Sequence, residues 1–210
     1  MVWYDKNAME SIYSGYENKL RQIAISVTEK IRDYGNAFTE ETGEKLYEHL
    51  SWRIKSEESM RKKCVSDGIP ETAHSALKEI HDAIGIRIVC LFIDDIRRNV
   101  EKIRQLQGSR VVQEKDYIHV ANPNGYRSYH LILQVEDSGP DIDGNTPGTY
   151  FVEVQLRTIA MDTWAALEHE MKYKKDIRHP ELISAELKRC ADELAACDVS
   201  MQTIRDLIRG

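Results

Sequence analysis

An alternation of apolar and polar residues marks residues 150–158 as a strand. In an extended strand successive side chains point to opposite faces, so the apolar residues share one face and the polar residues share the other. The polar face carries a carboxylate, an amide and a guanidinium, from Glu153, Gln155 and Arg157. The pattern leaves two interpretations open, the solvated outer face of a sheet or a functional surface.

A similar alternation runs from residue 128 to residue 135. The turn-rich segment 137–148 that joins the two strands is too short for a crossover helix, so we expect an antiparallel hairpin. In this hairpin His130 shares a sheet face with Glu153 if the register brings the two polar faces together.

Residues 83–92 are almost continuously apolar, which predicts a central strand. Arg87 interrupts the run, and a cation in a buried strand needs a partner or a ligand. Asp82, at the start of the strand, is a candidate for either role. Shorter extended segments are predicted at 52–55 and 116–120.

Helical periodicity predicts six helices. They are 7–34 with Gly35 as its cap, 40–50, one capped by Ser56, one capped by Asp94 and Asp95 that ends near Gly108, 159–173 with Trp164, Leu167 and Met171 pointing inward, and one that starts at Pro180. The last helix repeats apolar residues at intervals of three and four, like a coiled-coil seam: Leu187, Cys190, Leu194, Cys197, Met201, Ile204 and Ile208. We favour packing of this seam on the N-terminal helix of the same chain over a seam used only between subunits.

Composition is that of a globular protein, with 210 residues, 41% of them hydrophobic and 30% charged. The net charge of −6 argues against a general nucleic-acid binder, but basic residues cluster in 53–63 and 97–115. Such clusters suit a small polyanion such as a nucleotide. We expect a cytoplasmic protein without a signal peptide or membrane span, and the four cysteines, which lack zinc spacing, are expected to be buried, reduced thiols.

Two cations, Arg53 and Lys55, directly precede the helix predicted after Ser56, with Ser59 and Lys63 in its first turns. Free backbone N–H groups and the helix dipole favour anions at such an N-terminus, which makes it a candidate phosphate site. The alternative is a capped amphipathic helix with solvated lysines.

Two separated carboxylates, Asp82 and Glu153, could hold Mg²⁺ together with substrate phosphates. The loop signal at 121–125 places the aromatic Tyr126 beside a turn, where it could stack on a base. Positioning and charge neutralisation of this kind are what phosphoryl-type transfer requires.

Five motifs, taken together, resemble the synthetase motifs of the RelA/SpoT alarmone synthetases. They are Arg53-x-Lys55-x-x-x-Ser59-x-x-x-Lys63, Asp82-x-x-Gly85-Ile86-Arg87, Lys115-Asp116-Tyr117-Ile118, Asn124-Gly125-Tyr126-x-Ser128-x-His130 and Glu153-x-Gln155-x-Arg157-Thr158. The stretch 157–174 is similar to the small single-domain synthetases of the RelP/RelQ type. The resemblance covers residues 47–175, and five motifs in the family's order make it specific.

The resemblance implies an α+β fold, a mixed sheet of about five strands flanked by helices and related to nucleotidyltransferases. It divides the chain into an N-terminal helical region (1–43), a synthetase domain (44–178) and a C-terminal helix for packing or oligomerisation (179–210). Small members commonly form homotetramers, which the C-terminal heptads suit. Regulation by an alarmone or by RNA is left open.

The resemblance also implies a reaction, the transfer of the β,γ-pyrophosphate of ATP to the 3′-hydroxyl of GDP or GTP, with Mg²⁺ as cofactor. The products are AMP and ppGpp or pppGpp. By this resemblance, Arg53 and Arg87 hold the adenine of ATP between them. Lys55, Ser59 and Lys63 bind its phosphates. The family's motifs assign Mg²⁺ to Asp82 and Glu153, and the proton of the attacking hydroxyl to Glu153. They assign the acceptor nucleotide to Lys115, Asn124, Tyr126, His130, Gln155 and Arg157, with Tyr126 stacked on guanine.

Two other hypotheses compete with this reading. A toxin-like relative would pyrophosphorylate adenine nucleotides or the 3′ end of tRNA, and an inactive regulator would bind alarmone or RNA. The presence of both Asp82 and Glu153 argues against the inactive regulator. Two departures from the family pattern bear on specificity: Trp52 stands where many relatives carry a small residue, and Gln113 leaves the preference between GDP and GTP open.

Overall fold

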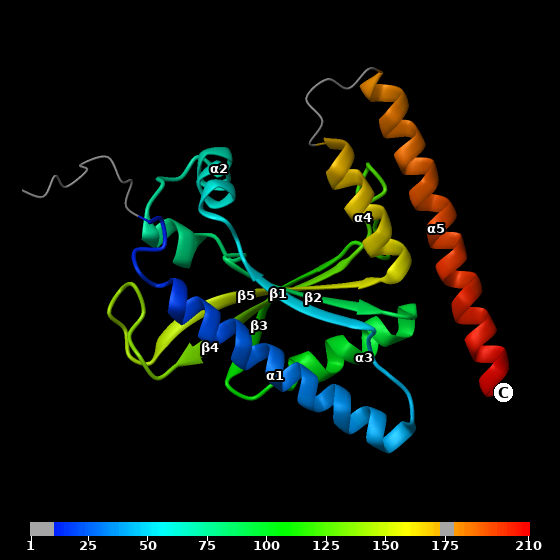
Figure 1. Cartoon of the computed structure of the whole chain (residues 1–210), viewed down its shortest axis with the longest axis horizontal. Coiled ribbons are helices and arrows are strands. Elements are labelled where there is room, and N and C mark those ends of the chain that lie inside the picture. Colours follow the sequence, from blue (N-terminus) through cyan, green and yellow to red (C-terminus); the bar gives the residue numbers. More distant parts are fainter. Residues whose placement is uncertain (1–10, 173–178) are drawn as a thin grey trace, which may run out of the picture.

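The fold is a mixed five-stranded sheet with helices on both faces, as the computed structural model shows for residues 11–172 and 179–210 (Figure 1). The strand order is β1-β2-β5-β4-β3, and the strands are β1 (His49–Ile54), β2 (Ile84–Cys90), β3 (Ser109–Asp116), β4 (Tyr129–Asp137) and β5 (Gly148–Thr158). β2 and β5 are parallel, and the other neighbouring pairs are antiparallel. The predicted α+β fold is confirmed.

β5 is the central strand, and its predicted alternation is confirmed. Val152, Val154 and Leu156 are fully buried, whereas Glu153 and Gln155 on the other face are half-buried. The predicted hairpin with β4 is also confirmed, with His130 directly opposite Gln155. Directly opposed residues point to the same face of an antiparallel pair, so His130 shares the polar face of β5.

Two helices cover the apolar face of the sheet: α1 (Glu17–Thr42) and α3 (Ile93–Arg104). Figure 1 shows α2 (Glu57–Asp67) and α4 (Ile159–Lys172) on the opposite side, with α5 (Pro180–Arg209) packed outside α4. The predicted cap of α2 is confirmed, because the Ser56 side chain accepts a hydrogen bond from Ser59 N. The polar face of β5 is therefore left between α2 and α4.

The N-terminal helix differs from its prediction. α1 begins at Glu17 and runs to Thr42, where Gly43 closes it at φ 74°, so the predicted helix over 40–50 is wrong. Gly35 lies inside α1 and serves close packing, because a Cβ there would come within 2.7 Å of the Tyr47 hydroxyl. Part of the predicted 7–34 helix, residues 7–10, lies outside the described residues.

Two predictions around α3 and β3 are also wrong. The residue before α3 is Phe92, without a side-chain cap, and the buried Asp95 pairs with Arg205 of α5 instead. Residues 117–120 form a turn after β3 rather than a strand. The Asp116 carboxylate explains this turn, because it accepts from the backbone N–H groups of Ile118 and His119.

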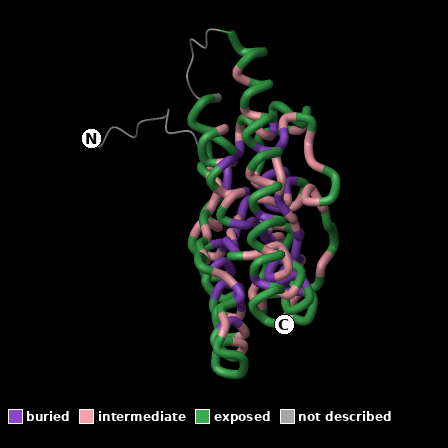
Figure 2. Tube along the Cα trace, turned by 90° about the vertical axis from the view of Figure 1, so that its right-hand side faces the viewer, coloured by how far each residue is buried: buried purple, intermediate pink, exposed green. Residues whose placement is uncertain are grey.

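The C-terminal helix packs on α4 and α3 rather than along α1, so the favoured packing of its apolar seam is wrong. Its buried residues, Ala191, Asp198 and Arg205, recur every seven positions on another face of the helix. Five seam residues are exposed: Cys190, Cys197, Met201, Ile204 and Ile208. Figure 2, viewed from the side of α5, shows how little of this helix is buried.

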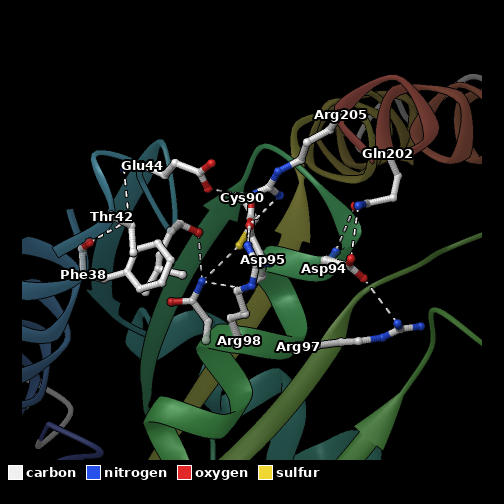
Figure 3. A network of polar contacts seen from close by, with 12 residues as sticks. Phe38, Thr42, Glu44, Cys90, Asp94, Asp95, Arg97, Arg98, Gln202 and Arg205 are labelled. Carbon is white, nitrogen blue, oxygen red and sulfur yellow. Dashed lines mark hydrogen bonds and ion pairs between the residues drawn. The ribbon is translucent and has the colours of Figure 1, made fainter. Parts of the chain in front are cut away.

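A network of polar contacts holds the C-terminal end of α5 against the rest of the fold (Figure 3). Arg205 Nη1 lies 2.7 Å from Asp95 Oδ1, its guanidinium stacks on the Phe92 ring at 4.4 Å, and Arg205 and Arg209 both contact Glu44. A buried cation that is paired and stacked can replace an apolar seam as the docking element, because its charge is compensated.

Several smaller predictions are settled by burial. In α4 Trp164 points inward as predicted, but Leu167 and Met171 are 50% and 38% exposed. The four cysteines are free thiols, yet Cys190 and Cys197 are exposed rather than buried.

None of the helices within the described residues could cross a membrane. The division of the chain at residues 43/44 and 178/179 stays a prediction.

Candidate active site

A cleft of about 280 Å³ opens on the polar face of the sheet, over β1, β2 and β5. It is lined by Ser51, Trp52, Arg53, Lys55, Asp82, Gly85, Ile86, Arg87, Glu153 and Gln155. The sheet register explains the convergence, since Gly85 pairs with Glu153 on one side and with Arg53 on the other. A glycine at this position leaves the floor open between the two longer side chains. Three of the five predicted motifs therefore contribute to one cleft.

On the side of β1 and α2, the Asp82 carboxylate forms ion pairs with two lysines. Lys55 Nζ and Lys63 Nζ each lie 2.6 Å from Asp82 Oδ2. Ser59 is exposed in the first turn of α2, and its hydroxyl meets that of Ser56. The predicted cluster of cations at this helix N-terminus is confirmed as geometry, and Arg53 lies exposed at its edge.

Asp82 is not the partner of Arg87, contrary to the sequence prediction. Arg87 Nη1 lies 3.3 Å from Asp162 Oδ1 of α4 instead. The reason is distance, because Asp82 precedes β2 and Arg87 lies five residues further along the chain, at about 3.3 Å per residue, whereas α4 contacts β2.

The second Asp82 oxygen, Oδ1, is buried and has no hydrogen-bond partner among the described residues. A bare carboxylate oxygen in a cleft that a second carboxylate, Glu153, also lines fits a divalent cation, which replaces the lost hydration. The described residues hold no group of three or more His, Cys, Asp or Glu suited to a metal ion. The donor set thus fits an ion such as Mg²⁺ that takes one or two carboxylates and completes its shell with phosphates and water.

On the β4 side, polar groups form a continuous chain. Glu153 Oε1 lies 3.0 Å from His130 Nδ1, and Glu153 Oε2 accepts from Gln155 Nε2 at 2.7 Å. His130 Nε2 lies 2.9 Å from the Tyr126 hydroxyl, which accepts from Arg157 Nη2 at 2.8 Å. The chain closes where Arg157 Nη2 also donates to Gln155 Oε1, at 3.0 Å. Five predicted site residues are therefore linked in one ring of hydrogen bonds.

This ring keeps Glu153 ionised. Burial alone would raise the pKa of Glu153, but the hydrogen bond and charge of His130, with the Gln155 amide and the charge of Lys63, lower it from 4.5 to about 2. A hydrogen bond to the charged form of a carboxylate favours that form. Glu153 is consequently a fixed anion at neutral pH.

Arg157 is the most tightly held cation of the site. Its side chain is 7% exposed, it donates from Nη1 to Asp162 Oδ1 at 3.0 Å, and its guanidinium carbon lies 5.2 Å from the Tyr126 ring centre. Cation–π contact and hydrogen bonds together fix the ring of Tyr126 next to the cleft.

The two remaining predicted residues, Asn124 and Lys115, are not among the residues that line the cleft. Asn124 accepts from Tyr126 N and donates to Glu168 of α4, which ties the 121–125 loop in place. Lys115 is exposed on β3 directly opposite His130, so it faces the same side of the sheet. Gly125 has φ 93°, and a Cβ there would lie 2.6 Å from Ala191 Cβ of α5, so this loop position requires glycine.

Two residues of the site were missed from the sequence. Asp162 holds both Arg87 and Arg157, and its signal was a carboxylate one turn into the helix that follows Arg157. Tyr117 packs edge-on against Tyr126 and His130, with ring centres 5.9 and 5.3 Å apart. Treating residues 116–120 as a strand hid this position of Tyr117.

Comparison with known proteins now identifies the class. Residues 52–178 match the family model described as the region found in RelA / SpoT proteins. GTP pyrophosphokinase YwaC of Bacillus subtilis (strain 168) is 39% identical over 163 residues, which cover 78% of this chain and 76% of that protein. GTP pyrophosphokinase YjbM of the same organism is 30% identical over 189 residues, or 88% of this chain and 84% of that protein. The chain therefore belongs to the RelA/SpoT family.

Solved structures narrow the assignment within that family. The crystal structure of small alarmone synthetase 1 from B. subtilis bound to its product pppGpp has a TM-score of 0.80 and 29% identity, covering 91% of this chain and 95% of that one. Small alarmone synthetase 2 from B. subtilis has a TM-score of 0.77 and 34% identity, covering 90% and 97%. The expected resemblance to the small synthetases with one synthetase domain is confirmed.

Proposed function

We propose that this chain is a GTP pyrophosphokinase, which transfers the β,γ-pyrophosphate of ATP to the 3′-hydroxyl of GDP or GTP. The observation that carries the proposal is the placement of Glu153, an ionised carboxylate between a cluster of cations and a fixed aromatic ring. The names of the relatives support the same activity. AMP and ppGpp or pppGpp are the products.

We assign ATP to the donor half of the cleft, which we define as Arg53, Lys55, Ser59, Lys63, Asp82 and Arg87. The lysines that hold Asp82 are positioned to turn to the phosphates, which carry more charge than one carboxylate. The planar guanidinium groups of Arg53 and Arg87 suit the two faces of adenine. This half neutralises the pyrophosphate that is transferred.

We assign the guanine nucleotide to the acceptor half, which we define as Lys115, Asn124, Tyr126, His130, Glu153, Gln155 and Arg157. Tyr126 stacks on guanine, and the 3′-hydroxyl donates a hydrogen bond to Glu153. The hydroxyl oxygen attacks the β-phosphorus of ATP, the bond between that phosphorus and the α–β bridging oxygen breaks, and AMP leaves. Because its pKa near 2 makes Glu153 a weak base, it orients the hydroxyl and takes the proton late, as the new bond forms.

Asp82 and Glu153 are the residues that would hold Mg²⁺, Asp82 through Oδ1, which has no partner in the part of the chain that the structure describes. When bound there, Mg²⁺ supplies positive charge that neutralises the phosphates and favours in-line attack. The residues of the chain keep the tasks of binding, orienting and proton transfer.

We also propose that copies of the chain associate, as a homotetramer, in the cytoplasm. The exposed apolar residues of α5 support this, since Met201, Ile204, Leu207 and Ile208 are each about half or more exposed. Regulation by alarmone or RNA is compatible with such an assembly and stays a hypothesis.

One assay tests the proposed activity. The protein is incubated with Mg²⁺ and ATP labelled on its γ-phosphate, and with GDP, GTP, GMP, ATP or tRNA in turn, and the products are separated. We expect labelled ppGpp with GDP and labelled pppGpp with GTP. Label transferred to adenine nucleotides or tRNA instead would establish the toxin-like reaction, and no transfer to any acceptor would refute the proposal.

A further inference from the structure

One carboxylate oxygen is shared by two arginines that belong to different halves of the cleft. Asp162 Oδ1 lies 3.0 Å from Arg157 Nη1 and 3.3 Å from Arg87 Nη1. Arg157 is in the acceptor half and Arg87 in the donor half. The neighbouring positive charges disfavour each other, and the charge of Arg157 contributes to the lowered pKa of Arg87, after burial.

The two arginines are held very unequally. Arg157 also donates to Tyr126 and Gln155, and its side chain is 7% exposed. The Arg87 side chain is 37% exposed, and the ion pair with Asp162 is the one polar contact of its guanidinium among the described residues. Arg87 can therefore leave Asp162 for a ligand, whereas Arg157 cannot move without breaking the hydrogen-bond ring.

The backbone of the first turn of α4, which carries Asp162, is held by side-chain hydrogen bonds. The Thr158 hydroxyl accepts from Met161 N at 3.1 Å, which fixes the first turn of α4, and donates to the buried Asp198 of α5 at 2.6 Å. The backbone that carries Asp162 therefore stays fixed when one of the two partners of its carboxylate departs.

We infer that Asp162 is a positioning residue that couples the two nucleotide subsites. When Arg87 turns to the adenine of ATP, the whole charge of Asp162 is left to Arg157, which strengthens the support of Tyr126 and Gln155. The donor nucleotide thereby raises the affinity for the acceptor, and by thermodynamic linkage the acceptor raises the affinity for the donor equally. The inference rests on the proposed function, because that function assigns the two arginines to different nucleotides.

The sharpest test needs no donor nucleotide at all. Arg87→Gln removes the partner that competes with Arg157, so GDP should bind this variant more tightly than the wild type, by about 5-fold, the lower range of typical coupling. Isothermal titration calorimetry with GDP and Mg²⁺ measures this gain. Damage to the fold would weaken binding, so a gain in affinity is a readout that a merely structural role would not produce.

Two further variants isolate Asp162. Arg97→Gln removes an exposed cation of α3 that pairs with Asp94 and does not line the cleft, and it should leave the GDP affinity unchanged. The double variant Arg87→Gln/Asp162→Asn should lose the gain in GDP affinity, because residue 162 no longer carries a negative charge that can act on Arg157.

The same coupling appears in the wild type with both nucleotides present. Saturating AMPCPP, an ATP analogue whose α–β bridge is a methylene group, should tighten GDP binding by about 5-fold or more, and Asp162→Asn should bring this ratio close to one. Asp137→Asn, which breaks the ion pair with Lys19 at the far end of β4, should keep the wild-type ratio.

Each outcome decides something. Two results would overturn the inference: unchanged or weaker GDP binding by Arg87→Gln, or a wild type in which the ATP analogue does not change the GDP affinity. Neither result bears on the proposed synthetase function of the wild type. Failure of the wild type to make labelled guanosine product would overturn the proposed function, a result that the binding data cannot mimic.

Discussion

The donor and acceptor halves of the cleft are built in opposite ways. In the donor half, two lysines bind one oxygen of Asp82. Within residues 11–172 and 179–210, the other oxygen has no hydrogen-bond partner and Arg87 is held by one ion pair. In the acceptor half, Glu153 and Arg157 lie in a closed ring of hydrogen bonds. One half has contacts that a ligand can take over, and the other is already joined by hydrogen bonds, although Arg157 Nε has no partner among the described residues.

The difference follows from what each half must bind. A triphosphate with a metal ion brings several negative charges, which replace Asp82 as the partner of the lysines. The acceptor nucleotide also carries phosphates, but its reacting hydroxyl brings no charge, so this hydroxyl needs a carboxylate that is already oriented and ionised. We therefore expect the donor half to rearrange on binding and the acceptor half to stay as it is.

The largest effect is expected from Glu153→Gln, which keeps the shape of the acceptor half but removes its charge. Loss of the hydrogen-bond acceptor and metal ligand should lower kcat by about 10²-fold or more. Steady-state rates with labelled ATP and GDP measure this. The variant should keep its circular dichroism spectrum, and turnover close to wild type would show that the proton and metal assignments are wrong.

Asp82→Asn should have a comparable but smaller effect, about 10²-fold on kcat, because the bare Oδ1 loses its charge. The two lysines lose their partner as well, so ATP should bind with similar or greater affinity. A rate that recovers fully at normal Mg²⁺ concentrations would contradict the metal assignment. The control is Asp143→Asn, an exposed carboxylate near Lys78 and outside the cleft, which should leave the rate unchanged.

Tyr126→Ala should act on the acceptor and spare the donor. Loss of base stacking should raise the KM for GDP and GTP by about 10-fold, while the KM for ATP changes little. Tyr126→Phe keeps the ring but loses the hydroxyl contacts with His130 and Arg157, so its effect should be smaller. An unchanged KM for both acceptors in the alanine variant would remove the stacking role.

A smaller effect concerns stability at acid pH. The pKa of Glu153 is lowered in the fold from 4.5 to about 2, so its contribution is complete above about pH 4.5 and is lost as the pH falls toward 2. Between these limits the free energy of unfolding should fall by up to about 3 kcal/mol more in the wild type than in Glu153→Gln. Urea unfolding at pH 5 and pH 3 tests this, and equal losses in both proteins would contradict the lowered pKa.

The core of the site could be predicted from the sequence because strand periodicity fixes which side chains share a face. The alternation in β5 placed Glu153, Gln155 and Arg157 together, and the short connection 137–148 predicted the hairpin with β4. The register that brings His130 beside them came from the structure. The motif resemblance added roles to these positions. Partners across elements were harder, since Arg87 has Asp82 near in sequence but Asp162 near in space.

The C-terminal helix shows why the rest could not be predicted. Its apolar seam satisfies a heptad pattern, yet the docked face is the polar stripe of Asp198 and Arg205, which bind Thr158 and Asp95. Periodicity reports which residues share a helix face, but it does not report what that face meets. Burial of paired charges follows from distant partners that one sequence does not reveal.

The most direct test of the proposed reaction is ³¹P nuclear magnetic resonance of one reaction mixture. The wild-type chain, with ATP, GTP and Mg²⁺, should produce AMP and a 3′-pyrophosphorylated guanosine nucleotide in equal amounts. The Glu153→Gln variant should leave both substrates unchanged over the same time. Appearance of ADP with inorganic phosphate, or of AMP with free pyrophosphate, and no 3′-pyrophosphate signal would contradict the assignment of this cleft as a pyrophosphate-transfer site.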